Sequence, residues 1–349
     1  MIVVGIDPHK KSHTAAALEA ASGRVIDRLS VPATDAGHRR LVGWMAGLDG
    51  PVRVALEDVR EVSGRLERAL IEAGLSVCRV PPRLMGQARR AGRERGKSDP
   101  IDAVAVARAG LAHPELPLAR LAGPERQLGL LVSHREDLVG ERTRIQARLR
   151  GHLHVLDPGL EVPPRALERA IWLDRIGARL EPMQGMRARI ASELVADCRA
   201  IGVRIDRLER EIARIAAELA PELLAIPGCG ALTAAKSLAE VAGIERFASS
   251  ARLARYGGVA PVPASSGART RHRLDRAGNR QLNCALYRIA ITQGRIHAPA
   301  RDYLAKKQAE GQSRREAIRC LKRHLVNVIF RTMSERTSAT GALPAAALT

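Results

Sequence analysis

Two carboxylates stand three residues apart in the segment GKSDPIDAVAVARAG, at positions 99 and 102. On a helix this spacing puts Asp99 and Asp102 on one face, where their negative charges repel each other unless a cation lies between them. Paired carboxylates of this kind suit Mg²⁺ or Mn²⁺, which prefer hard oxygen ligands. The alternative is local: Asp99 would cap a helix after Ser98, and Asp102 would complement the positive end of its dipole.

Two further acids occur where short apolar runs end. Asp7 follows the run IVVGI, and Glu57 follows the run VRVAL. Adjacent strand ends of a twisted sheet would bring both side chains to Asp99 and Asp102. Four converging carboxylates suit two divalent cations, which would stabilise the attacking and leaving oxygens of a phosphodiester displacement. Asp58 directly follows Glu57, and the sequence leaves open which of the two faces this site.

The first 110 residues predict a mixed α/β domain that would position these acids. β-branched apolar runs indicate strands, and apolar residues at helical spacing indicate helices. The predicted elements are a strand over 2–7, two strands within 12–33, a helix over 35–48, a strand over 51–58, a helix over 62–75 and a strand over 76–82. This order is that of the ribonuclease H-like fold.

The composition indicates the partner of such a site. The 349-residue chain has a net charge of +20, carried mostly by arginine. Arginine forms bidentate contacts with phosphate, so we expect salt-sensitive binding to nucleic acid. Only 2% of the residues are aromatic, which disfavours a stacking platform for single strands. Without a signal-peptide layout or an apolar run of about twenty residues, the expected location is cytoplasmic, with the bacterial nucleoid and no membrane contact.

The middle of the chain, residues 116–222, is expected to form a helical coiled-coil region. Apolar residues step by threes and fours from Leu194 to Leu219, over about four heptads. A second helical series runs from about residue 125 to 153. The heptad seam is the apolar stripe from Leu194 to Leu219. It would pack either against the helix at 125–153 in the same chain or against a second subunit, and the second arrangement would make a homo-oligomer.

The segment LLAIPGCGALTAAKSLAEV, at 223–241, resembles a helix-hairpin-helix. Gly228 and Gly230 would let backbone N–H groups approach a DNA phosphate, and Lys236 would add a cation. The alternative is a plain turn between two helices. Four further cations, in a basic loop and at the start of the helix after it, are expected to bind nucleic acid: Arg269, Arg271, Arg273 and Arg280.

Ser265 and Ser266 stand at the apex of the basic loop, before a glycine. A serine hydroxyl attacks a phosphodiester only when its proton is removed and cations or metal neutralise the developing charge. By themselves, two serines and a glycine are typical of a turn. The residues alone therefore do not make either serine a nucleophile.

The two halves of the sequence together resemble the DEDD insertion-sequence transposases of the IS110 family. The N-terminal half has GIDPHKKSH and KSDPIDA, and the C-terminal half has GVAPVPASSGARTRHRLDRAGNRQLNCALY. The resemblance implies a RuvC-like first domain with Asp7, Glu57, Asp99 and Asp102 as the metal ligands. It also implies that Ser266 becomes joined to DNA, with Ser265 as the alternative. The segment EDVREVSG departs from the family, which often has a small hydroxyl residue, glycine and an aromatic after the glutamate.

The same resemblance implies the partners and the assembly. A member of this family would recombine double-stranded DNA under the guidance of a structured RNA. It would act as a dimer, or a tetramer in synapsis, in which one subunit's serine meets another subunit's metal site. The expected parts are a RuvC-like catalytic domain at 1–115, the helical region at 116–222, a C-terminal transposase domain at 223–336 and a disordered tail at 337–349.

Two arginine-rich segments are further candidates for contact with phosphate or RNA. One is the group Arg89, Arg90, Arg93 and Arg95, and the other is the helix expected over 314–331. The alternative for both is a solvated helix face.

Two other functions fit parts of the pattern. A junction nuclease would use the same acids with water as nucleophile, and a DNA-bridging protein would need none of the acids.

Overall fold

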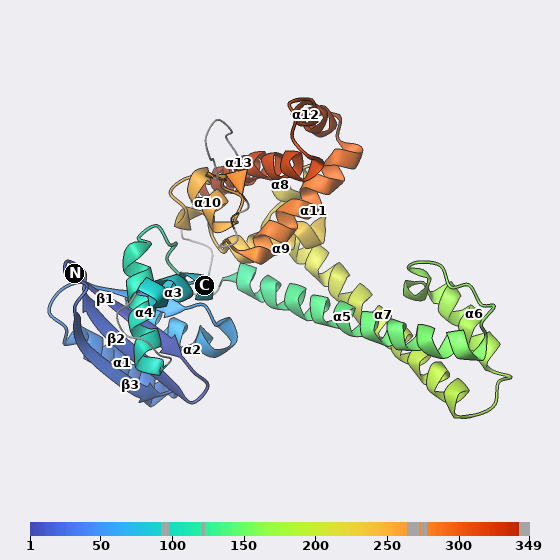
Figure 1. The fold of residues 1–349 in the computed structure, drawn as a ribbon, viewed down its shortest axis with the longest axis horizontal. Helices are drawn as coiled ribbons and strands as arrows, with labels where there is room; N and C mark the ends of the chain where they lie inside the picture. The colour runs from blue at the N-terminus through green and yellow to red at the C-terminus, as the bar shows by residue number, and fades with distance from the viewer. Residues whose placement is uncertain (92–97, 120–122, 264–271, 274, 276–277, 342–349) are drawn as a thin grey trace. The chain divides into compact units, whose positions relative to one another are not determined.

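The computed structural model describes residues 1–91, 98–119, 123–263, 272–273, 275 and 278–341. The chain forms two compact units, one made of Met1–Gly123 with Gly243–Thr349 and one made of Pro124–Ala242 (Figure 1). Within the described residues, no helix combines the length and the apolar character needed to cross a membrane.

The N-terminal part of the first unit is a mixed α/β domain, as predicted. Its elements are β1 (Ile2–Pro8), β2 (Ser12–Glu19), β3 (Val25–Pro32), α1 (Asp35–Ala46), β4 (Val52–Glu57), α2 (Arg60–Glu72), β5 (Ser76–Val80), α3 (Pro82–Ala91) and α4 (Asp99–Ala112). The sheet order is β3-β2-β1-β4-β5. β1 pairs with β2 antiparallel and with β4 parallel. The helix α3 between β5 and α4 was not predicted from the sequence.

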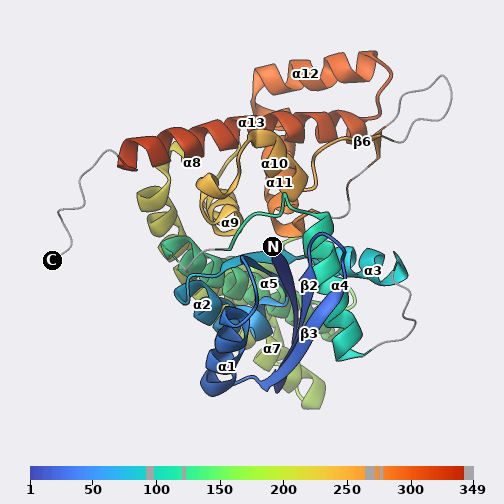
Figure 2. The ribbon, with the colours of Figure 1, turned by 90° about the vertical axis from the view of Figure 1, so that its left-hand side faces the viewer.

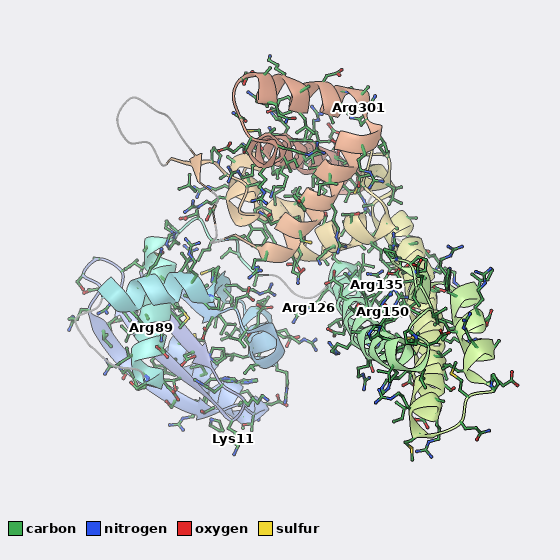
Figure 3. All side chains as sticks on the ribbon, turned by 45° about the vertical axis from the view of Figure 1, so that its right-hand side comes forward. Lys11, Arg89, Arg126, Arg135, Arg150 and Arg301 are labelled. Atoms are coloured by element: carbon green, nitrogen blue, oxygen red, sulfur yellow. The ribbon has the colours of Figure 1, made fainter. Side chains whose placement is uncertain are left out.

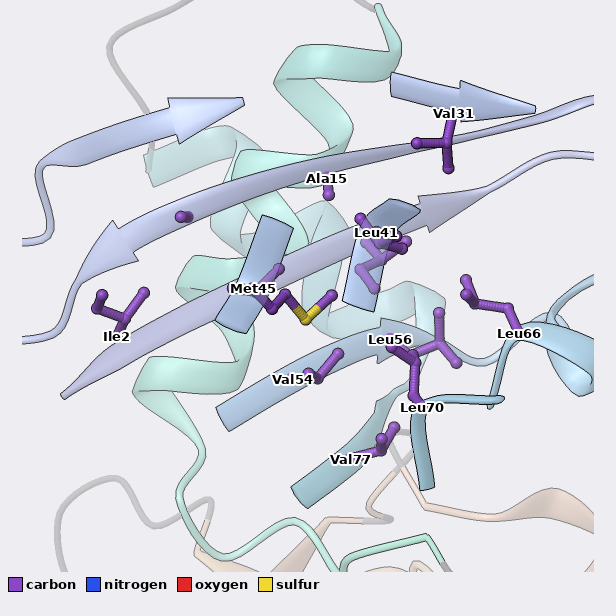
Figure 4. Packing of buried hydrophobic residues seen from close by; sticks show 13 residues of the cluster. Ile2, Ala15, Val31, Leu41, Met45, Val54, Leu56, Leu66, Leu70 and Val77 are labelled. Atoms are coloured by element: carbon purple, nitrogen blue, oxygen red, sulfur yellow. The ribbon is translucent and has the colours of Figure 1, made fainter. Parts of the chain in front are cut away.

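Hydrophobic residues of β1 alternate between the two faces of the sheet. Ile2, Val4 and Ile6 belong to the core that also contains residues of α1 and α2 (Figure 4). Val3 belongs to the core on the opposite face, with residues of α3 and α4. Because side chains alternate along a strand, Asp7 has the same parity as Val3 and stands on the face covered by α4.

The second unit is helical. Its elements are α5 (Pro124–Leu156), the short 3₁₀ helix η1 (Ala166–Glu168), α6 (Ala170–Leu180), α7 (Met186–Leu219), α8 (Pro221–Leu224) and α9 (Ala231–Val241). α5 and α7 lie side by side (Figure 1). Apolar residues of the predicted seam are buried within this single chain: Leu194, Cys198, Ile201, Ile205, Leu208 and Ile212. Of the two alternatives for the seam, the structure shows packing within one chain.

The remaining elements complete the first unit. They are η2 (Ile244–Arg246), α10 (Ser250–Tyr256), β6 (Val262–Pro263), β7 (His272–Arg273), α11 (Arg280–Ile296), α12 (Ala298–Ala309) and α13 (Arg314–Gly341). α10, α11 and α12 all pack against α13 (Figure 2). α13 includes residues 337–341 of the expected tail, and the rest of that tail lies outside the described residues.

Candidate metal centre

Asp7 and Glu57 stand side by side where two parallel strands end. The register of β1 and β4 pairs Ile6 with Leu56, so the next residue of each strand is Asp7 and Glu57. Ile6 and Leu56 both belong to the core on the α1 and α2 side. Alternation along the strands therefore turns both acids to the opposite face, under α4. This parity identifies Glu57, rather than Asp58, as the acid that shares a face with Asp7.

The helix α4 carries the second pair of acids and lies very close to β1. An added Cβ at Gly5 would overlap the backbone of Ala103 and of Ala107, so only glycine permits this approach. Asp99 and Asp102 are in the first turn of α4, and Ser98 rather than Asp99 is the N-cap residue. The alternative in which Asp99 acts only as the helix cap is therefore wrong.

The carboxyl groups of Asp7 and Glu57 are close enough to shift each other's pKa. The main cause of the raised pKa of each is burial, and for Glu57 the contact with Asp7 adds to it, so that its pKa rises to about 7. Their contact lowers the pKa of Asp7 and raises that of Glu57. Near neutral pH, Glu57 is therefore partly protonated.

His9 lies between two of the acids. Its Nδ1 is 3.6 Å from Asp7 Oδ2 and 4.0 Å from Asp99 Oδ2. These three residues offer ligand atoms that all lie within 4.8 Å of one another. Sequence reasoning missed His9, although it stands two residues after Asp7 in the motif GIDPHKKSH and imidazole is a common metal ligand.

Arg89 of α3 balances the charge of Asp102. Its Nη1 donates a hydrogen bond to Asp102 Oδ1 over 3.0 Å. Asp102 is buried, and its charge also acts to raise the pKa of Asp7 and of Glu57. The sequence predicted that Arg89 would contact phosphate or be solvated, but in the structure it pairs with an acid of the site. Arg93 and Arg95 lie outside the described residues, as does the side chain of Arg90.

The donor set fits a divalent cation. Asp7 is only 4% exposed, and its Oδ2 is buried without a hydrogen-bond partner among the described residues. His9 Nδ1, 3.6 Å from this oxygen, is beyond hydrogen-bond distance. A buried carboxylate oxygen without a hydrogen bond is costly, so a bound cation would stabilise it. Oxygen donors from Asp7, Glu57, Asp99 and Asp102 match the preference of Mg²⁺ or Mn²⁺.

The expected nucleophile loop is only partly described. Ser265 and Ser266 lie outside the described residues, and so do Arg269 and Arg271. The loop is closed by a two-stranded antiparallel ribbon, β6 and β7, in which Val262 pairs with Arg273. The sequence did not predict this ribbon. Arg280 is exposed at the start of α11, after the N-cap residue Asn279.

The Pro-Gly-Cys-Gly turn lies between α8 and α9 in the second unit. Gly228 has φ +80°, a left-handed conformation that favours glycine, and Gly230 is the N-cap residue of α9. α8 is a single turn of four residues. Lys236 was expected to contact DNA, but it is 5% exposed and its Nζ donates to Glu136 Oε1 over 2.6 Å. This buried ion pair leaves its ammonium group unavailable to a phosphate.

Basic side chains project from both units. Figure 3 labels six of them, Lys11 before β2, Arg89 on α3, Arg126, Arg135 and Arg150 on α5, and Arg301 on α12. Part of this charge is used inside the fold, since Arg135 pairs with Glu209 of α7. Lys11, Arg150 and Arg301 are exposed, as expected for a surface that binds a polyanion.

Two family models match the chain in order. The first, described as a transposase of the DEDD type of IS110, matches residues 4–158. The second, described as the transposase IS116/IS110/IS902 family, matches residues 220–305. Together they cover more than half of the chain, including the four acids and the loop with Ser266.

Relatives from insertion elements are similar over almost the full length. An uncharacterized 44.8 kDa protein of insertion element IS116 from Streptomyces clavuligerus is 29% identical, covering 98% of this chain and 97% of its own. An uncharacterized 43.6 kDa protein of IS110 from Streptomyces coelicolor is 26% identical, covering 99% and 96%.

Solved structures of RuvC from Thermus thermophilus, one of them in complex with a Holliday junction substrate, align with 33% of this chain at 19% identity. The TM-score of each alignment is 0.27, and 94–95% of each RuvC chain is covered.

The family assignment rests on the family models and the full-length relatives. They show that the chain belongs to the IS110 family of transposases, which are enzymes that recombine DNA.

Proposed function

We propose that this transposase cleaves and rejoins DNA strands at a divalent-metal centre, with Ser266 as the nucleophile. The metal ligands would be Asp7, Glu57, Asp99 and Asp102. The observation that carries the proposal is the placement of buried Asp7 and half-buried Glu57 side by side under α4, where Asp7 Oδ2 has no hydrogen-bond partner among the described residues. When bound, Mg²⁺ or Mn²⁺ supplies Lewis-acid activation of the scissile phosphate.

The chain's own residues then perform a transesterification. Ser266 Oγ loses its proton and forms a bond to phosphorus, while the bond from phosphorus to one strand oxygen breaks and that oxygen takes up a proton. The product is a phosphoserine ester and a free strand end. A strand hydroxyl that attacks this ester reverses the step and releases the serine. Each step exchanges one phosphate ester bond for another, so the reaction needs no nucleoside triphosphate.

Other parts of the proposal come from the family resemblance. The basic surfaces would bind double-stranded DNA and a structured guide RNA, and the active form would be a homo-oligomer in the bacterial cytoplasm, at the nucleoid. The catalytic part would be residues 1–115, with the nucleophile supplied from the segment 223–336. Since the α7 seam is already covered within the chain, subunit contacts would use other surfaces.

Two single substitutions test the mechanism. Asp102→Asn removes one charged ligand with little change in volume, and Ser266→Ala removes only the hydroxyl. We expect each to lower strand transfer by at least about 10³-fold, while filter binding of DNA stays within about threefold. The covalent protein–DNA species, trapped in SDS, should be missing from both.

The matched control is Ser265→Ala, which makes the same change one residue away. If Ser265→Ala abolishes the adduct and Ser266→Ala does not, the nucleophile is Ser265. If Ser266→Ala and Ser265→Ala both retain cleavage while Asp102→Asn does not, water is the attacking group and the protein is a nuclease. Full activity in Asp102→Asn would contradict the metal centre.

A further inference from the structure

A cavity of about 740 Å³ lies among the helices of the C-terminal segment, and its lining contains none of the four acids of the proposed metal centre. Residues 258–261, which lead directly into β6, line part of it. Residues of α12 and α13 also line it, including Tyr303, Lys307, Arg319, Lys322, Arg323 and His324. The packing of α12 against α13 that forms this region is visible in Figure 2.

Lys322 is a buried cation at the wall of this cavity. It is 4% exposed, and its Nζ donates to Asn283 Oδ1 over 2.7 Å. No carboxylate of the described residues lies within 4 Å of this ammonium group. Burial lowers the pKa of Lys322 to about 8, and the nearby Arg319 also lowers it. A buried charge without an opposite charge is costly, so this position favours an anionic ligand.

The acids of the cavity are already engaged by other cations. Glu310 is held by Lys307 over 2.6 Å, and Asp275 by Arg255 over 3.0 Å. Glu316 accepts hydrogen bonds from Ser313 and lies 3.4 Å from Arg319 Nη2. Arg323, by contrast, donates to the amide oxygen of Asn327 on its own helix. Within the part of the chain that the structure describes, Lys322 and Arg323 are therefore the cavity's cations without a carboxylate within 4 Å, although the Lys322 ammonium also lies 5.8 Å from the centroid of the Tyr287 ring.

An aromatic pair stands beside these cations. Tyr303 and His324 meet edge to face with ring centroids 5.0 Å apart, and the Tyr303 hydroxyl is 3.1 Å from His324 Nε2. Fixed rings beside positive charge are the combination that proteins use to bind the base or sugar of an unpaired nucleotide together with its phosphate.

Hydrogen bonds through Asn283 connect Lys322 of the cavity to the backbone just before β6. Asn283, which accepts from Lys322, donates from Nδ2 to the carbonyls of Gly257 and Gly258, over 2.8 and 3.1 Å. These carbonyls begin the segment that runs into β6. Lys322 is therefore linked through Asn283 to the backbone segment that leads into β6.

We propose that this cavity binds one nucleotide of a nucleic-acid strand, with the ammonium of Lys322 and the guanidinium of Arg323 on its phosphate. The rings of Tyr303 and His324 would face the attached sugar and base. This inference rests on the proposed function, because it takes the nucleic acid handled by the transposase as the ligand. DNA and RNA offer the same phosphodiester, so the experiment separates these two sources.

The test is binding of fluorescently labelled single-stranded oligonucleotides, one DNA and one RNA of the same sequence, measured by anisotropy in EDTA. Lys322→Gln removes the charge but keeps a donor for Asn283. We expect about a tenfold loss of affinity for at least one oligonucleotide, and a salt slope reduced by about 0.7 for the lost phosphate contact. The control is Lys306→Gln, which removes one exposed positive charge of α12 outside the cavity.

Each outcome decides the proposal. If Lys322→Gln loses affinity only for the DNA oligonucleotide, or only for the RNA one, the proposal is supported and the ligand of the cavity is identified. Equal affinities of Lys322→Gln, Lys306→Gln and the unmodified protein for both strands would overturn it. If Lys322→Gln does not fold, Arg323→Gln at the same cavity is expected to give a loss of about fivefold, and unchanged binding there counts equally against it.

The assay separates this inference from the proposed function. It contains no divalent metal and involves no strand transfer, so Asp102→Asn should bind both oligonucleotides normally even though it is inactive. Normal binding by Lys322→Gln, alongside an inactive Asp102→Asn, would reject only the cavity. Weak binding by Lys322→Gln, alongside a fully active Asp102→Asn, would reject only the metal centre.

Discussion

Near neutral pH the carboxyl of Glu57 keeps a proton that an exposed carboxyl would release. Burial raises the pKa of Asp7 and of Glu57, and the contact with Asp7 raises that of Glu57 further, to about 7. A divalent cation would take the place of this proton, since it binds carboxylates and not carboxylic acids. Metal binding and proton release are therefore expected to be coupled at this pair.

The coupling predicts a pH-dependent metal affinity. The pKa of Glu57 is about 7, so below this pH a bound cation must displace about one proton. The affinity for Mn²⁺ should fall about tenfold for each pH unit below 7 and change little above it. Isothermal titration of EDTA-stripped protein between pH 5.5 and 8.5 measures this. In Glu57→Gln the affinity should be lower at pH 8 and nearly independent of pH.

The pH dependence of the stability of the metal-free protein gives a second measurement of the raised pKa of Glu57. Glu57 has a higher pKa in the folded chain than its ordinary value of 4.5, so between pH 4.5 and 7 the folded state binds more protons than the unfolded state. Its contribution to stability is therefore present below pH 4.5 and is lost as pH rises through 7. Thermal melts of Glu57→Gln should lose this slope, and an unchanged slope would contradict the raised pKa of Glu57.

At the scale of elements, α4 determines whether the acids converge. The strand ends were predictable because apolar runs finish at Asp7 and Glu57, and the helix start was predictable from Asp99 and Asp102. The distance between helix and sheet depends on small residues. Gly5 allows α4 to touch β1, and an added Cβ at Gly110 would lie 2.5 Å from the Ala55 side chain.

Gly5→Ala should therefore damage the domain. The new Cβ would overlap backbone atoms of α4, which cannot move aside as a flexible side chain does. We expect a loss of about 1–3 kcal/mol in the free energy of unfolding, measured with denaturant. Mn²⁺ affinity should also fall, because α4 carries two of the acids.

Gly43→Ala is the matched control for this substitution. Gly43 is exposed on α1, and an added Cβ there would have no heavy atom within 4 Å. This change should stabilise the protein by about 0.5–1 kcal/mol through helix propensity. Equal effects at the two glycines would show that α4 does not depend on close approach.

Some features could not be predicted because their partners are far away in the sequence. Lys236 looked like a DNA contact in a glycine-rich turn, but its partner Glu136 lies 100 residues earlier. The apolar neighbours Ala234, Ala235 and Leu238 were the available signal that this face of α9 is buried. The strands β6 and β7 have two residues each, too few for a recognisable alternation.

At the scale of the whole molecule, the proposed acids and the proposed nucleophile belong to distant parts of the sequence. Asp102 and Ser266 are separated by the entire helical unit, Pro124–Ala242. The family resemblance implies that the serine of one subunit serves the acids of another. A homo-oligomer built in this way has composite sites, each of which needs one residue from each of two chains.

Mixing two inactive variants tests this arrangement. A dimer of Asp102→Asn with Ser266→Ala has one site in which both substitutions meet and one site that has neither. If the sites are composite, an equal mixture should regain the covalent protein–DNA adduct at about a quarter of all sites, because half of the dimers are mixed. Only the Asp102→Asn subunit can carry the adduct, since it alone keeps the serine. If each chain supplies both residues to its own site, every site in the mixture is defective and no adduct forms. Subunits labelled by different masses and resolved in SDS after incubation with DNA distinguish the two arrangements.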